Sequence, residues 1–245
     1  MKSFAMAAVV ALAAGSAHAA FFSFASGSAS NAWTFNGNAL SLTDGTGPGN
    51  PILLQIDDNN GPAPALQVSV SFVAQYTLTF VGAVNLPGGA QALSYAANGS
   101  FTFTDIAAGT PLLTTTFSNA LFSVRAGANN GPWATTASLQ VDNGLGASVS
   151  MVWGGANLPQ YGLAPGALTG SPRGFGFDLT GLNSSGAMPY NGQNPGVATN
   201  SVSRLPEAQW WSEASYSSTA NVIPAPASIA LMGLGGLAIA RRRRA

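Results

Sequence analysis

The 245-residue chain contains no cysteine, one histidine and one lysine, and only 7% of its residues are charged. Without cysteine the chain has no disulfide scaffold, no thiolate metal site and no cysteine nucleophile. The low charge, together with 9% aromatic residues, argues against a disordered polyelectrolyte. A folded chain of this length suits one or two domains, and one domain is favoured if the fold is all-β.

The few charges are unevenly placed along the chain. Five of the eight basic residues lie near the ends, at Lys2 and at Arg241, Arg242, Arg243 and Arg244. All eight acidic residues lie between them, so the middle of the chain carries three arginines and a net charge of −5. The middle therefore lacks a basic patch for nucleic acid, and the terminal arginine run needs another explanation.

The amino terminus has the three parts of a secretory signal peptide. Lys2 provides a positive charge, residues 4–14 form an unbroken apolar run, and Ala17-His18-Ala19 has the small-x-small pattern that signal peptidase reads. We expect residues 1–19 to be removed, so that the mature protein begins at Ala20. Removal of this segment also takes away the only histidine and the only lysine.

The carboxyl terminus carries a second hydrophobic signal. Residues 223–240 are apolar or small throughout, begin with Pro224-Ala225-Pro226 and are followed by the four arginines Arg241, Arg242, Arg243 and Arg244. As a helix, the 14 residues after Pro226 would extend only ~21 Å, which is short of the ~30 Å hydrocarbon core. A marginal span with an arginine stop on the cytoplasmic side suits a transient membrane anchor.

This tail resembles the PEP-CTERM sorting domain, with Ala225 at the position of the central glutamate of the motif. The resemblance implies that residues 223–245 are a sorting tail that an exosortase removes after transient attachment to the inner membrane. It also implies a Gram-negative bacterium that makes exopolysaccharide and grows in biofilms, with an outer surface or extracellular matrix as the destination. The partners implied are signal peptidase and exosortase. The alternative is a permanent single-pass tail anchor.

The segment from Leu66 to Val81 alternates between apolar and polar residues almost without exception. Period-2 alternation predicts a strand, and here its even-numbered face would be buried. Because sixteen residues are long for one strand, we expect a bulge, a bend or a break near Val73.

Weaker alternation predicts further strands at residues 100–104, 137–141, 147–153, 174–179 and 210–219. Asp142-Asn143-Gly144 predicts a hairpin between the second and third of these, and Asn98-Gly99 and Asn60-Gly61 are also read as turns. Residues 154–172 and 181–206 are rich in Gly, Pro, Asn and Ser and are predicted to be long loops. We therefore expect residues 20–222 to form a single all-β domain, a jelly-roll-like β-sandwich, with a closed barrel as the alternative.

The chemistry open to the mature chain is limited. Without histidine and lysine there is no Ser-His-Asp triad, no histidine-rich zinc site and no Schiff-base lysine, which leaves carboxylate chemistry. Asp57, Asp58 and Asn60 are read as a polar turn, with a Ca²⁺ site as the alternative and no other cofactor expected. Glu207 and Glu213 are interpreted as solvated surface.

Trp210 and Trp211 are adjacent in a predicted strand and should point to opposite sides of the sheet. One ring would then pack in the core. For the other, packing under the long loops is favoured, and stacking on a sugar is the alternative; Trp153 is assigned to the core. The favoured function is an exported, non-catalytic envelope or matrix protein associated with exopolysaccharide. The alternatives are a carbohydrate-binding module and, third, a secreted hydrolase that uses carboxylates.

Overall fold

The computed structural model describes residues 19–25, 33–36, 39–44, 52–57, 65–141, 146–168, 173–180, 199–207 and 210–221. These residues contain twelve strands and two short 3-10 turns, Pro87–Gly89 and Pro159–Tyr161. The strands are β1 (Ala19–Ala25), β2 (Trp33–Asn36), β3 (Ala39–Asp44), β4 (Ile52–Asp57), β5 (Leu66–Asn85), β6 (Gln91–Asp105), β7 (Thr110–Ala126), β8 (Trp133–Gln140), β9 (Ser148–Trp153), β10 (Gly166–Leu168), β11 (Arg173–Thr180) and β12 (Trp210–Asn221).

The strands form one continuous sheet in which every pairing is antiparallel. Hydrogen-bonded neighbours run in a closed ring, β1–β4–β5–β6–β7–β8–β11–β12, because β12 pairs again with β1. The pair β2–β3 forms a second link between β12 and β5, and β9 with β10 extends from β7.

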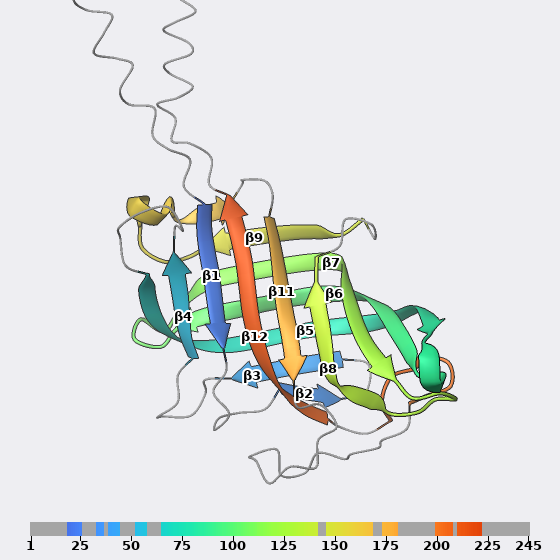
Figure 1. The fold of residues 1–245 in the computed structure, drawn as a ribbon. Coiled ribbons are helices and arrows are strands. Elements are labelled where there is room, and N and C mark those ends of the chain that lie inside the picture. The colour runs from blue at the N-terminus through green and yellow to red at the C-terminus, as the bar shows by residue number, and fades with distance from the viewer. Residues whose placement is uncertain are drawn as a thin grey trace, which may run out of the picture.

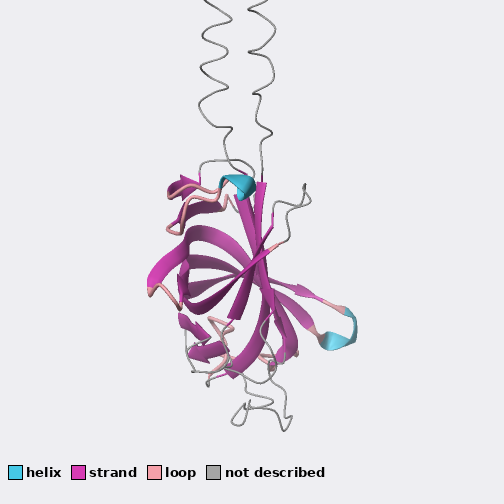
Figure 2. Ribbon diagram, turned by 90° about the vertical axis from the view of Figure 1, so that its left-hand side faces the viewer, coloured by secondary structure: helices cyan, strands magenta, loops and turns pink. Residues whose placement is uncertain are grey.

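The ring is folded into two layers whose strands cross each other. One layer holds β4, β1, β12, β11 and β8, and the other holds β5, β6, β7 and β9 (Figure 1). Strands curve from one layer into the other at the sides of the molecule (Figure 2). The predicted all-β class is confirmed. The two layers belong to one closed sheet, however. They therefore correspond to the predicted alternative, a closed barrel, more closely than to a sandwich of two separate sheets.

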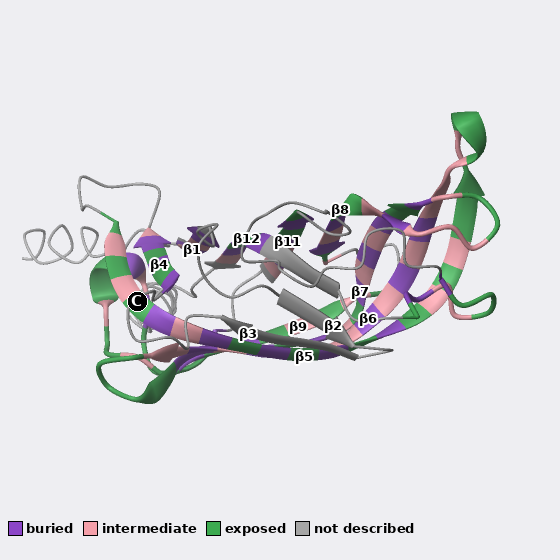
Figure 3. Cartoon of the chain, turned by 90° about the horizontal axis from the view of Figure 1, so that it is seen from below, coloured by how far each residue is buried: buried purple, intermediate pink, exposed green. Residues whose placement is uncertain are grey.

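The even-numbered face of β5 faces the core, as the alternation predicted. Val70, Phe72, Ala74, Tyr76 and Leu78 are buried, whereas Val73, on the opposite face, is 46% exposed. Figure 3 shows this alternation of buried and exposed residues along β5. The predicted irregularity near Val73 is wrong, because the ladder with β6 runs through Val73 in register and shifts only between Phe80 and Gly82.

Aromatic rings fill the space between the layers. Phe72 and Phe103 from one layer lie 4.8 Å apart between ring centroids, and Phe177 and Tyr216 from the other lie 4.7 Å apart. Rings also meet across the layers, with Phe72 5.8 Å from both Phe24 and Phe177. Such tilted and edge-on pairs are the preferred aromatic geometries, and they fix the spacing of the layers.

Two turn predictions are wrong, because neither motif connects two strands that pair with each other. Strands β8 and β9 do not pair with each other, because both pair with the 17-residue β7, along different stretches of it. Residues 142–145 of the predicted hairpin, like Asn60-Gly61, lie outside the described residues. Asn98-Gly99 lies inside the continuous strand β6, opposite a β-bulge in β7, and a side chain on Gly99 would collide with the backbone carbonyl oxygen of Gln75.

The predicted long loops are partly ordered against the sheet. In residues 154–168 the chain forms the short strand β10 and buries Tyr161, Leu163 and Leu168. In the second region only residues 199–206 are described, and they bury Thr199, Leu205 and Pro206. Within the described part of the chain, no helix has the length and apolar character needed to cross a membrane.

Candidate functional site

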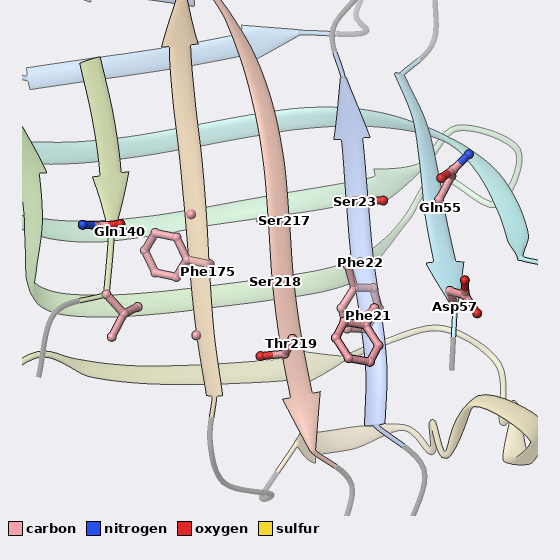
Figure 4. A pocket seen from close by; sticks show the side chains of 13 residues that line it. Phe21, Phe22, Ser23, Gln55, Asp57, Gln140, Phe175, Ser217, Ser218 and Thr219 are labelled. Atoms are coloured by element: carbon pink, nitrogen blue, oxygen red, sulfur yellow. The ribbon is translucent and has the colours of Figure 1, made fainter. Parts of the chain in front are cut away.

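A polar groove crosses the outer face of the layer that contains β4, β1, β12, β11 and β8 (Figure 4). It has a volume of about 650 Å³, within the range of ligand sites. Two cross-strand rows form it, because paired residues of neighbouring strands point to the same face. One row is Asp57, Phe21, Thr219 and Gly174, and the other is Gln55, Ser23, Ser217, Gly176 and Gln140.

Glycines give the groove its depth at β11. A Cβ atom added to Gly174 or Gly176 would meet no heavy atom within 4 Å, so the space above this strand is open. The side chains of Phe175 and Phe177 on the same strand are buried below the sheet. In β11, the glycines therefore leave the polar groove open on the outer face, and the phenylalanines anchor the strand in the core on the inner face.

Uncharged hydrogen-bonding side chains line the groove together with apolar ones such as Phe21 and Val141. Hydroxyls come from the central strands β1 and β12, whereas the amides of Gln55 and Gln140 lie on opposite sides of them (Figure 4). Phe21 contributes a partly exposed ring, and Asp57 is the one carboxylate among the lining residues. Such a surface suits an uncharged ligand rich in hydroxyl groups, because hydroxyls both donate and accept hydrogen bonds.

A second, smaller hollow of about 500 Å³ lies farther along the outer face, over β6, β7, β8 and β11. Its lining includes the aligned hydroxyls of Ser94, Ser123 and Ser138. It also includes Arg125 and Asp178, so this hollow carries charges of both signs. The hydroxyl-rich character of the polar groove thus continues across the sheet.

The predicted saccharide-stacking pair lies in β12 but away from the polar groove. Trp210 pairs with Phe35 and Trp211 with Thr34 of β2, whereas the groove lies where β12 pairs with β1. The side chains of Trp210 and Trp211 lie outside what the structure describes, and so does that of Glu213. Glu207 is exposed, whereas Trp153 is buried in the core as predicted.

The predicted cation site is only partly within the described residues. Asp57 ends β4 at the edge of the polar groove, whereas Asp58 and Asn60 lie outside the described part. Among the residues that the structure describes, no three His, Cys, Asp or Glu side chains gather as a metal site would require.

Sequence reasoning missed an anchor between the segment 199–207 and the sheet. The backbone carbonyl oxygen of Arg204 accepts a hydrogen bond of 2.7 Å from the Tyr95 hydroxyl and one of 3.2 Å from Trp133 Nε1. The Arg204 guanidinium in turn donates to Gln91 Oε1 at 2.7 Å. Burial raises the pKa of Tyr95, so its hydroxyl stays protonated as a donor. These three hydrogen bonds hold the segment 199–207 against the sheet, so we assign them a structural role.

The first and last strands of the domain are paired at the ends where the two predicted targeting segments attach. Ala20, the predicted first residue of the mature chain, pairs with Ala220, and Ala19 pairs with Asn221 (Figure 1). The last residue of the signal cleavage motif, Ala19, is thus also the first residue of β1, and the pairing that remains after cleavage begins at Ala20. Ala17 and the tail residues Pro224, Ala225, Pro226 and Arg241–Arg244 lie outside the described residues.

Comparison with protein families identifies this tail. Residues 222–244 match the PEP-CTERM protein-sorting motif, which begins at the residue after the end of β12. Neither a curated protein nor a solved structure shows significant similarity to the chain. The chain is thus a protein with a PEP-CTERM sorting motif, which marks it as an exported bacterial protein targeted to an exosortase.

Proposed function

We propose that this chain is a non-catalytic protein of the outer surface or extracellular matrix of a Gram-negative, biofilm-forming bacterium. The observation that carries the proposal is the sorting motif at 222–244, which follows the last strand of a compact all-β domain directly. In this proposal signal peptidase removes residues 1–19, and an exosortase releases the domain from its transient anchor in the inner membrane.

The intact mass of the protein from native culture tests this order of processing. We expect a chain that begins at Ala20 and lacks Arg241, Arg242, Arg243 and Arg244. A mass that retains these four arginines would refute sorting by cleavage and would favour a permanent tail anchor. A chain that retains residues 1–19 would refute the signal peptide.

We further propose that the polar groove binds a neutral polysaccharide of the matrix. Its hydroxyl and amide groups match the hydroxyl groups of sugars, and the partly exposed ring of Phe21 offers a surface on which a sugar can stack. The groove contains one carboxylate and no cation, so hydrogen bonding and stacking rather than charge would give the affinity.

Filling the groove provides a direct test. Gly176→Val places a β-branched side chain in open space, which favours the strand and blocks the trough at the same time. We expect this variant to fold and to lose retention on a column of neutral polysaccharide. Gln75→Ala, on the exposed face of β5 and outside the rows of the groove, is the control and should leave retention unchanged. Retention that survives Gly176→Val but is lost in Trp210→Ala or Trp211→Ala would transfer the site to the tryptophan pair.

The absence of catalysis is also part of the proposal. Carboxylate-based glycosidases need two carboxyl groups that lie ~5–5.5 Å or ~6.5–9.5 Å apart. Among the described residues that line the polar groove, Asp57 is the one carboxylate. We expect no turnover of α- or β-linked polysaccharides by the mature protein, either with Ca²⁺ or with chelator. Turnover that is abolished by Asp57→Asn, Glu207→Gln or Glu213→Gln would overturn this part of the proposal.

A further inference from the structure

The last residues of β12 are held on both sides almost up to the point where the sorting motif begins. Thr219 pairs with Phe21 of β1 on one edge and with Gly174 of β11 on the other. Ala220 is paired in the same way with Ala20 and Arg173, whereas Asn221 pairs only with Ala19, a residue that we expect signal peptidase to remove. The end of β12 is therefore an internal strand of the sheet, and Val222, the first residue of the matched motif, follows it without a spacer.

This arrangement leaves little chain between the folded domain and the Pro224-Ala225-Pro226 segment. Two residues separate Asn221 from Pro224, and even when fully extended they add only about 7 Å. A domain of this size has a radius of gyration of about 16 Å. The body of the domain thus lies directly against any enzyme that acts at the start of the motif.

An enzyme that cuts a backbone holds its substrate as an extended chain, often as an added strand. The residues before the cut would have to lie in the enzyme, but the sheet already holds them. Both cannot hold the same backbone groups at once, because Thr219 and Ala220 are paired with β1 on one edge and with β11 on the other.

We infer that opening of the last pairs of β12 in the mature chain, at Thr219 and Ala220, controls the rate at which the exosortase removes the tail. This inference rests on the proposed sorting function and adds a regulatory step to it. Cleavage of a locally opened state follows the population of that state when opening is fast. The stability of the β1–β12 end therefore sets how long the folded protein stays attached to the membrane.

The inference is tested in the native bacterium by following loss of the tail after a pulse of synthesis. One variant carries six Gly and Ser residues inserted between Asn221 and Val222, which leaves both the domain and the matched motif unchanged. A second variant, Phe21→Cys with Thr219→Cys, locks the last part of the ladder with a disulfide. Directly opposed residues of antiparallel strands have Cα atoms ~4.5–5.5 Å apart, which a disulfide can bridge, and the chain has no other cysteine.

We expect the insertion to speed removal of the tail by about tenfold and the lock to slow it by about tenfold or more. In the combined variant the lock should lose its effect, because the inserted residues supply the extended chain. Ser23→Cys with Ser217→Cys is the matched control lock, placed two pairs farther into the ladder, and it should slow removal less. A reducing agent should restore the rate in both locked variants.

The outcomes separate this inference from the proposal on which it rests. Retention of the tail by the unaltered protein would refute sorting by cleavage. Removal of the tail at one rate in the unaltered, lengthened and locked proteins would leave sorting intact and overturn the control by β12. Because the insertion changes no residue of the sheet, a folding defect of the locked variants cannot decide the outcome alone.

Discussion

Truncation of Phe72 to alanine should cost the domain about 3–5 kcal/mol of unfolding free energy, the usual range for a buried phenylalanine. Phe72 is fully buried, and its ring lies 4.8–5.9 Å between centroids from the rings of Phe24, Phe101, Phe103 and Phe177. These rings come from both layers of the sheet. A cavity at Phe72 therefore removes contacts on several sides and leaves little room for collapse.

Urea unfolding of the chain without its two terminal hydrophobic segments measures this cost. The buried tryptophans Trp133 and Trp153 provide a fluorescence signal for the loss of packing. With a slope of about 2 kcal/mol per molar urea, the midpoint should fall by about 1.5–2.5 M. Because domains are stable by only about 5–15 kcal/mol, Phe72→Asp should prevent folding altogether.

The adjacent residues of β5 provide the controls. Val73 lies on the opposite face and is 46% exposed, so Val73→Ala should change the unfolding free energy by no more than about 0.5 kcal/mol. Ser71→Asp should likewise be tolerated. Equal losses of stability in Phe72→Ala and Val73→Ala would show that the register of β5 and the packing of the two layers are wrong.

Three further results follow from single contacts in the sheet. Gly99→Ala should destabilise the domain by several kcal/mol, because its Cβ would collide with the carbonyl oxygen of Gln75, whereas Gly174→Ala should be tolerated; thermal unfolding measures both. Tyr76→Phe should keep or raise stability, because the buried Tyr76 hydroxyl has no hydrogen-bond partner among the described residues. Tyr95→Phe should cost about 1 kcal/mol by removing the donor to Arg204, and a urea midpoint lowered by Tyr76→Phe would contradict this reasoning. Burial raises the pKa of Tyr76 above its usual value of about 10, so the folded state binds the proton more tightly. The unaltered domain should therefore lose stability as pH rises above 10, and Tyr76→Phe should weaken that loss in a pH series of urea midpoints.

The strands that were predicted from the sequence are those whose alternation is unbroken. In β5 the apolar residues keep one phase from Val70 to Leu78, so the buried face could be recognised from the letters alone. In β7 the phase changes, because Asn119 adds a residue at the bulge opposite Asn98 and has a φ of 53°. Apart from Leu112, the buried residues are odd-numbered before Asn119 and even-numbered after it, so a period-2 pattern does not reveal this 17-residue strand.

The misleading turn signal at Asn98-Gly99 has the same origin. Asn98 Oδ1 accepts a hydrogen bond of 3.0 Å from the backbone N–H of Asn119, and Gly99 allows the close approach of Tyr76. A bulge and a hairpin both favour asparagine and glycine, and the letters do not distinguish them. The location of the partner strand makes the difference, and it depends on contacts between distant segments.

The polar groove could not be predicted either, because no single strand contains it. Gly174 and Gly176 fit the alternation of β11 as the solvent-facing residues, and Ser217 does the same in β12. They become a site only because β4, β1, β12, β11 and β8 align their outward residues in rows. The strand β1 was not predicted, although its residues also alternate. Ala20, Phe22 and Phe24 are buried, and Phe21 and Ser23 lie between them on the other face.

The pairing of β1 with β12 connects the fold to the two ends of the chain. The first strand of the domain is the first to leave the translocation channel, but one of its two partners is the last strand before the tail. The sheet therefore cannot close until all of β12 has been exported, by which time the sorting segment has reached the membrane. Closure then occupies the backbone groups of β12 up to Ala220, two residues before the motif. If the last strand were not one of the two strands that close the sheet, the residues before the motif would stay unpaired. The tail could then be cut whether or not the domain had folded. In this protein the same hydrogen bonds that complete the fold also restrict access to the segment that releases it.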